Sequence, residues 1–265
     1  MAGRALIVLS IAYIGLAHGA PDAAPNGLPR GAREWHFQVL LDGKKIGQHD
    51  FLIAPDQDRD PTAVRVTSAA DFQVRFLGIP VYHYRIRDIE HWRGHCLQQM
   101  NADADDDGDR TQVRGVRAGD RFDITAVTLG RDAPPLAASS TGCAFSFAYW
   151  DPALAVQQAL INPQTGRVER VSISKIPPTT IDVAGHATPA RGIRIASAVA
   201  PIDVWYAATG GAWIGLDTTV GKSRHLSYRL TALSPPLQDP GPAAIPPGTS
   251  RANDPGPGGP VAKNP

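Results

Sequence analysis

Hydrophobic and polar residues alternate along most of the chain, which is the pattern of strands that bury one face. In EWHFQVLL (34–41) the aromatic and aliphatic residues share one side, and QHDFLI (48–53) repeats the alternation after the turn DGKKIG (42–47). Asp-Gly between two such runs is typical of a β-hairpin. About a dozen similar segments with short links follow. The pattern predicts an all-β fold of antiparallel strands.

The polar side of these strands carries His, Arg, Gln, Asp and Ser, while the other side is aliphatic and aromatic. A sheet of this kind curves over its apolar face and leaves the other face in water or facing a ligand. Closure, complete or partial, protects the edges of so many strands. We therefore expect a strongly curved sheet or an incomplete barrel rather than a two-sheet sandwich.

One segment, AYWDPALAVQQALINPQTGRV (148–168), breaks the alternation. Asp151 can cap a helix, and Pro152 suits its first position. Val156 and Leu160 would lie on one apolar face of this helix, and the Asn-Pro at 162–163 would end the helix. We predict one short helix near 152–161, anchored by Trp150 and packed against an edge or opening of the sheet as a plug or lid.

The two ends of the chain differ from the middle. Arg4, an apolar run at 5–16 and small residues at 17–20 are typical of a secretory signal peptide, predicted for residues 1–20. Residues 234–265 hold ten prolines and five glycines, and we expect a disordered tail. The remaining 33–233 suits a single β domain.

The predicted location is outside the cytoplasm, in the periplasm or the extracellular space. The apolar run at 5–16 is shorter than the ~20 residues that span a bilayer, so no transmembrane span is expected. A formal net charge of +1 gives no general electrostatic reason to bind nucleic acid. The chain carries no Gly-rich phosphate loop and no His-Glu-x-x-His, and we expect no cofactor.

The chain has two cysteines, Cys96 and Cys143. In an exported protein such a pair favours one disulfide. A reactive thiol is the alternative, because His95 adjoins Cys96, but one neighbour in sequence is weak support for a lowered thiol pKa.

Several stretches together resemble a bacterial family of exported proteins known as domain of unknown function 6134. They are LDGKKIGQHDF (41–51), FLGIPVYHYRIRDIEHWRGHCL (76–97), CAFSFAYWDPALAVQQALINPQTGRV (143–168), VWYAATGGAWIGLDTT (204–219) and LSYRL (226–230). The resemblance implies no activity or catalytic residue. The sequence also resembles, more distantly and in architecture only, the half-barrels of periplasmic lipoprotein carriers.

Two groups of residues could bind a metal. Asp103, Asp105 and Asp107 resemble the start of a calcium loop, but its twelfth position holds Arg114 in place of a carboxylate, and a polar hairpin turn explains them as well. His83, His91 and His95 are too far apart along a strand to share one zinc ion, unless Gly94 breaks the strand. No metal site is therefore predicted.

A ligand site is suggested by two neighbouring strands. Arg75, His83, Arg85 and Arg87 would form a cationic surface on their polar face, suited to a carboxylate or phosphate. The alternative is a solvated face on which Asp71, Asp88 and Glu90 neutralise the arginines. Aromatic walls would come from a second set of residues: Tyr82, Tyr84, Trp92, Trp205 and Trp213.

Three functions remain open. The first is a carrier or binder of a lipid-like or other amphipathic small molecule in the bacterial envelope. The second is a hydrolase whose Ser, His and Asp are dispersed in sequence. The third is an envelope scaffold that uses its proline-rich tail.

Overall fold

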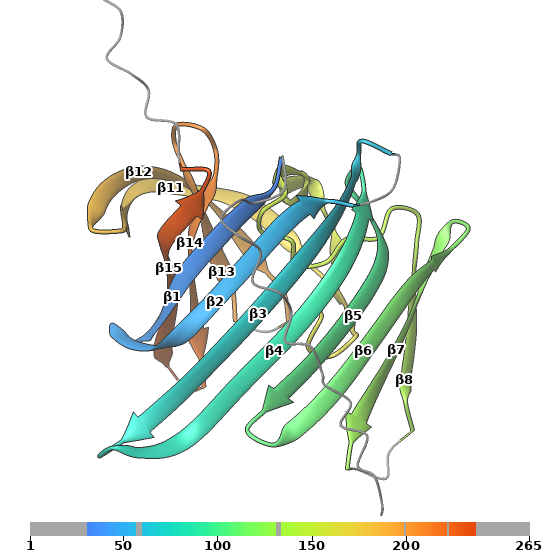
Figure 1. Cartoon of the computed structure of the whole chain (residues 1–265), viewed down its shortest axis with the longest axis horizontal. Helices are drawn as coiled ribbons and strands as arrows, with labels where there is room; N and C mark the ends of the chain where they lie inside the picture. The colour runs from blue at the N-terminus through green and yellow to red at the C-terminus, as the bar shows by residue number, and fades with distance from the viewer. Residues whose placement is uncertain (1–30, 57–59, 131–133, 199, 222, 237–265) are drawn as a thin grey trace, which may run out of the picture.

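The computed structural model of the chain describes residues 31–56, 60–130, 134–198, 200–221 and 223–236 (Figure 1). The predicted signal peptide at 1–20 and nearly all of the predicted tail at 234–265 lie outside these residues. No helix among the described residues is long and apolar enough to cross a membrane.

The described residues form one open antiparallel sheet of thirteen strands and a small two-stranded sheet, which confirms the predicted all-β fold and its incomplete closure. The order in the large sheet is β11-β12-β13-β14-β15-β1-β2-β3-β4-β5-β6-β7-β8. The strands are β1 (Arg33–Leu41), β2 (Lys44–Pro55), β3 (Ala63–Phe76), β4 (Ile79–Arg93), β5 (Cys96–Asp106), β6 (Asp109–Ala118), β7 (Arg121–Leu129), β8 (Leu136–Thr141), β9 (Ala159–Ile161), β10 (Val168–Arg170), β11 (Ser172–Val183), β12 (His186–Ala196), β13 (Ile202–Ala207), β14 (Trp213–Val220) and β15 (Arg224–Ser234).

Four hairpins share one turn geometry. Their two-residue turns are Asp42-Gly43, Leu77-Gly78, Asp107-Gly108 and Ala184-Gly185, and both residues of each turn have positive φ. This is the arrangement of type I′ turns, whose twist matches that of the flanking strands. Asp suits the first position because its short polar side chain tolerates the left-handed conformation. The Leu at the second turn is therefore unusual.

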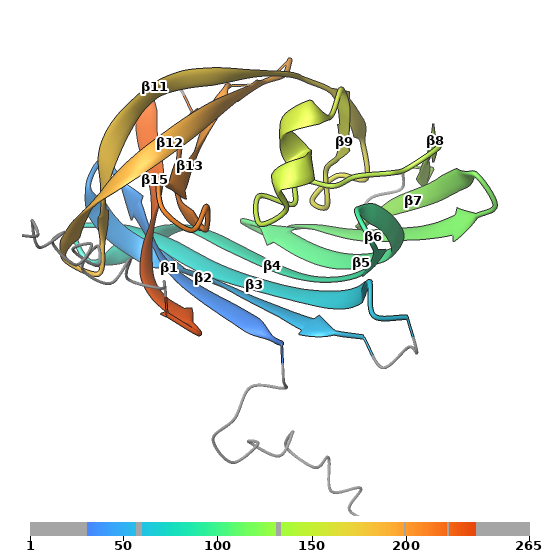
Figure 2. The ribbon, with the colours of Figure 1, turned by 90° about the horizontal axis from the view of Figure 1, so that it is seen from above.

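The sheet bends so that its apolar face becomes concave. Figure 2 shows β11 and β12 arching over one half, while β9 and the helical turn occupy the concave side of the other half. The main core lies between these layers and includes Phe37, Trp213 and Phe51, with the rings of Phe37 and Trp213 4.2 Å apart. The convex face is polar, as the alternation predicts.

The predicted helix is shorter than expected. A 3-10 helix, η1, covers Pro152–Val156, whereas Ala159–Ile161 is strand β9 and pairs with β10. The carboxylate of Asp151 accepts a hydrogen bond from the Ala153 amide at 2.9 Å. Leu160, which the sequence predicts at the end of a longer helix, lies instead on β9 and is buried in the core. Pairing with β10 outweighs the weak stability of a ten-residue helix.

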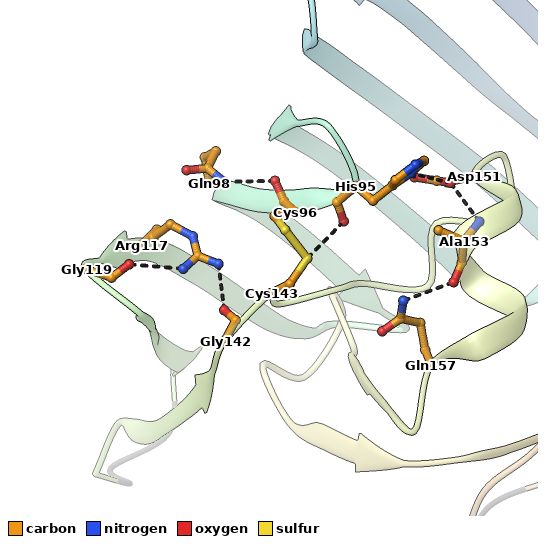
Figure 3. Close-up of a disulfide and its surroundings, with 10 residues drawn as sticks. All are labelled: His95, Cys96, Gln98, Arg117, Gly119, Gly142, Cys143, Asp151, Ala153 and Gln157. Carbon is orange, nitrogen blue, oxygen red and sulfur yellow. Dashed lines mark hydrogen bonds and ion pairs between the residues drawn. A yellow bond between two sulfur atoms is a disulfide. The ribbon is translucent and has the colours of Figure 1, made fainter.

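A disulfide holds this segment to the sheet (Figure 3). Cys96 at the start of β5 is bonded to Cys143, with the two Cα atoms 5.0 Å apart. Beside it, His95 Nδ1 lies 2.9 Å from the buried Asp151 carboxylate, and Arg117 donates to the Gly142 carbonyl at 2.6 Å. The same Asp151 thus caps η1 and fixes it to the β4–β5 turn. Trp150 packs edge-on against Trp92, with 5.5 Å between ring centroids.

Removing the disulfide should destabilise the domain. It joins residues 47 apart, so the chain-entropy model gives a loss of about 4 kcal/mol for the variant Cys96→Ala/Cys143→Ala. Urea unfolding of the oxidised protein and the variant measures this difference. Reductant should shift the parent midpoint towards that of the variant and leave the variant unchanged. Equal midpoints for the two oxidised samples would contradict the expectation.

Candidate functional site

The predicted cationic cluster lies on the convex face and is partly neutralised there. Asp71 accepts hydrogen bonds from Arg85 at 3.0 Å and 3.2 Å, and its other oxygen lies 3.2 Å from His83 Nε2. Arg75 donates to the Gln73 side chain, and Arg87 stands opposite Asp103 in the sheet register. Exposed pairs of this kind contribute little binding or stability. The interpretation as a solvated, ion-paired face therefore fits these residues better than a ligand site, with Asp71 as a neutralising acid. The expected role of Asp88 and Glu90 there is wrong, because both are buried on the other face of β4.

The predicted aromatic walls are separated from that cluster. Tyr84 points into the concave side and stacks on Phe72, with centroids 5.2 Å apart. The indole N–H of Trp213 donates to the Gly215 carbonyl, and that of Trp205 donates to Asp217 at 2.7 Å. Because Tyr84 and Arg85 are adjacent in one strand, they face opposite sides of the sheet. A ligand against the aromatic residues cannot also meet the arginines.

Two other members of the predicted sets are accounted for by local contacts. Tyr82 donates its hydroxyl hydrogen to Asp106 at 2.6 Å. Trp92 is fully buried in the core and donates to Glu90 at 2.9 Å.

The metal candidates have other partners. Asp103 accepts from Gln112 and Arg114, Asp105 accepts from the Gly108 amide, and Asp107 sits in the β5–β6 turn. His91 and His95 bind two different carboxylates, those of Asp56 and Asp151. Within the described ranges, no three His, Cys, Asp or Glu side chains are grouped to hold a metal ion.

A buried carboxyl pair lies on the concave face of β4. Asp88 and Glu90 are both buried and hydrogen-bonded to each other. Burial raises the pKa of Asp88 well above its usual value, and the charge of Glu90 raises it further. Burial also raises the pKa of Glu90, although hydrogen bonds from Ser146 and Trp92 oppose that shift. Both shifts favour the protonated form, so the buried pair retains a proton to higher pH than exposed carboxyl groups do.

One oxygen of this pair is not satisfied. Asp88 Oδ1 is buried and has no hydrogen-bond partner among the described residues, and the same holds for the Tyr206 hydroxyl. An unpaired buried acceptor costs about 1–3 kcal/mol.

A histidine lies near this pair. His49 Nε2 is 2.7 Å from the Ser68 hydroxyl, and its Nδ1 is 3.4 Å from the Tyr228 hydroxyl. Ser68 is paired in register with Asp88 on the next strand. Burial lowers the pKa of His49 to about 3, so the ring is neutral at physiological pH. We call His49, Ser68, Asp88, Glu90 and Ser146 the inner polar cluster.

A separate cleft lies between η1 and the arching strands β11–β13. Its volume is about 420 Å³, within the ~300–1,000 Å³ typical of small-molecule sites. The apolar part of its wall comes from both layers: Pro152, Ala155, Ile176, Pro178, Ile193 and Tyr206. We call this space the η1 cleft.

Two cations border the η1 cleft. Lys175 on β11 and Arg191 on β12 line it, and both are exposed. Neither forms an ion pair or side-chain hydrogen bond with any residue in the described part of the chain. Gly192 lies between the apolar walls, where a Cβ atom would approach the Trp205 ring to 2.5 Å. Only glycine fits there without displacing the tryptophan.

The sequence alone did not predict the inner polar cluster or the η1 cleft. One signal for the carboxyl pair was available, because Asp88 and Glu90 fall in phase with Tyr84, Ile86 and Trp92 on the apolar side of β4. Period-two alternation continued through the strand would have identified two buried acids. Lys175 and Arg191 carry no such signal, since their proximity to η1 depends on the arch of β11 and β12.

The described residues form an open, strongly curved antiparallel sheet with a cleft lined on one side by a helical turn. A family model described as a domain of unknown function (DUF6134) matches residues 37–231, from β1 to β15. The chain belongs to this family, as its sequence indicates. No curated protein matches the sequence.

The carboxyl pair should make stability fall as pH rises. The folded protein holds more protons than the unfolded chain between about pH 4 and the raised folded pKa values, so alkali favours unfolding. Asp88→Asn keeps a donor towards Glu90 and removes one of the two titrations. Its free energy of unfolding should therefore decrease less than that of the parent between pH 4.5 and pH 8, in urea titrations. Asp103→Asn, on the convex face, is the control, and parallel curves for parent and Asp88→Asn would contradict the expectation.

The partly buried His49 should act in the opposite direction. The unfolded chain takes up a proton below about pH 6.5, whereas folded His49 does so only near pH 3, so stability is lost as pH falls through this window. His49→Gln retains a hydrogen-bonding group towards Ser68 without titrating. The variant should lose less stability than the parent between pH 7 and pH 4.5. The exposed His186→Gln should behave like the parent. A loss in His49→Gln equal to that of the parent would refute the assignment.

Proposed function

We propose that this protein, exported to the bacterial envelope, binds an amphipathic molecule with an anionic end in the η1 cleft. The observation that carries the proposal is the combination of apolar walls with two cations that have no carboxylate partner in the described residues. An acyl chain or similar group would lie against Ile176, Ile193 and the Tyr206 ring. Its carboxylate or phosphate would lie near Lys175 and Arg191.

The position of η1 supports this function. Its exposed side contributes Pro152 and Ala155 to the wall, while Leu154 on its other side is fully buried in the core. The disulfide and the Asp151–His95 contact hold the segment in place. The wall is thus preorganised, which reduces the entropic cost of binding.

The proposal predicts charge-dependent binding. Binding of a long-chain fatty acid and of the alcohol of equal chain length is measured by displacement of a fluorescent probe. In Lys175→Gln/Arg191→Gln, two screened ion pairs of ~0.2–1 kcal/mol each are lost, so affinity for the acid should fall about 2- to 30-fold. Affinity for the alcohol should change less than twofold.

Two further variants locate the site. Arg87→Gln removes a cation of the convex face and should leave both affinities unchanged. Ala155→Glu places a negative charge on the cleft wall and should weaken the acid most. Absence of fatty-acid binding by the parent, or a full effect from Arg87→Gln, would reject the proposal.

A hydrolase is the second candidate, favoured by the 2.7 Å contact between Ser68 and the neutral His49. The low pKa makes His49 a weak base for the Ser68 hydroxyl, and Tyr228 stands in the orienting position that a carboxylate occupies in Ser-His-Asp triads. A fluorophosphonate probe should then label the parent and not Ser68→Ala. Absence of label on the parent would remove this candidate.

A further inference from the structure

The hairpin between β3 and β4 exposes an unusual amount of apolar surface at its end. Phe76, Leu77, Ile79 and Val81 are 67%, 87%, 65% and 54% exposed. They are half of the eight large hydrophobic residues classed as exposed in the described part of the chain, and they lie within six consecutive positions. We call Val74–Val81 the β3–β4 tip.

The β3–β4 tip projects beyond its neighbours. On one side the last register partner is Gly47 opposite Phe72, and on the other it is Asp106 opposite Tyr84. Pairing within the hairpin continues to Phe76 opposite Ile79. Four further residues at ~3.3 Å each extend the tip by roughly 13 Å. Figure 1 shows it reaching past the β1–β2 turn and the β5–β6 turn.

The residue at the turn argues against a purely structural role. Leu77 has a φ of 50°, a conformation that bulky residues rarely adopt. At the equivalent position of the other three turns of this type the chain has Asp42, Asp107 and Ala184. Leu77 is thus unfavourable in its backbone and in its exposure, where Asp would serve both. Such an outlier points to a contact that the isolated molecule lacks.

The area of the tip favours a lipid surface over a protein partner. Four side chains, taken at ~200 Å² each, expose roughly 500 Å². A stable protein interface needs about 800 Å² per partner. A small apolar projection can instead enter the boundary of a bilayer to a depth of ~5–10 Å.

The charges behind the tip match a zwitterionic surface. Arg75 bonds to Gln73 and to the Gly78 carbonyl and forms no ion pair with another described residue, so its charge is available to a lipid phosphate. The β5–β6 turn beside β4 carries Asp105, Asp106 and Asp107. These acids would be repelled by an anionic membrane and tolerated by phosphocholine.

We propose that the β3–β4 tip inserts into phospholipid bilayers, with Phe76, Leu77 and Ile79 among the acyl chains and Arg75 at the phosphates. This membrane contact is independent of ligand binding in the η1 cleft. It would hold the sheet at a lipid surface reversibly, because one short apolar tip is a weak anchor.

Co-sedimentation of the full chain with phosphatidylcholine vesicles tests the proposal. The parent should bind them, with less than a twofold change between 0.1 and 0.5 M NaCl. Leu77→Asp should lower the partition coefficient at least tenfold, and its thermal midpoint should not fall because Asp suits the turn. Ala184→Asp introduces Asp at the equivalent position of the β11–β12 turn, and this variant should bind like the parent.

Three results would overturn the proposal. They are absence of parent binding to the vesicles, equal binding by Leu77→Asp, and binding that requires anionic lipid and disappears at 0.5 M NaCl. Light scattering of the parent and of Leu77→Asp measures their oligomeric state. A dimer of the parent that Leu77→Asp dissociates, without vesicle binding by either, would assign the tip to self-association instead.

Discussion

The pairing of β1 with β15 holds the large sheet together as one unit. It joins two meanders, β1–β8 and β11–β15, into one sheet, with Glu34 opposite Ser234 and Leu41 opposite Leu226. The loop entropy of bringing together residues nearly 200 positions apart must be offset by burial on the concave face. This pairing also places Tyr228 beside Val39 and within reach of His49. The inner polar cluster thus depends on contact between the two ends of the domain.

Ionisable side chains are accommodated differently on the two faces of the sheet. On the convex face, arginines and carboxylates pair in water, where each pair contributes little. On the concave face, Asp88 and Glu90 avoid the cost of two buried charges by sharing a proton, and His49 avoids it by staying neutral. Replacing these groups by apolar residues would give a simpler core. Their presence marks a place where the sequence departs from a purely apolar core.

Alternation along the sequence was enough to predict the strands, the curvature and the open sheet, because one buried face imposes period two on almost every segment. It could not predict which face encloses the cleft, so it left Arg75, His83, Arg85 and Arg87 open to two interpretations, a ligand site and a solvated face. The helix predicted near 152–161 is longer than the observed one because local propensity does not include the pairing of Leu160 with β10. Lys175 and Arg191 meet η1 only through the arch of β11 and β12. No local pattern encodes that arch.

The antiparallel register of β1 and β15 also determines where the domain can be tethered. The first residue of β1 and the last of β15 lie at the same end of the sheet, since Glu34 is paired with Ser234. β3 runs parallel to β1, two strands away, so its far end at Phe76 lies at the opposite end. An anchor, fusion partner or solid support joined directly to the start of β1 or the end of β15 would therefore lie at the end of the sheet away from Leu77. Such an attachment would orient the domain without obstructing the exposed apolar residues of the β3–β4 tip.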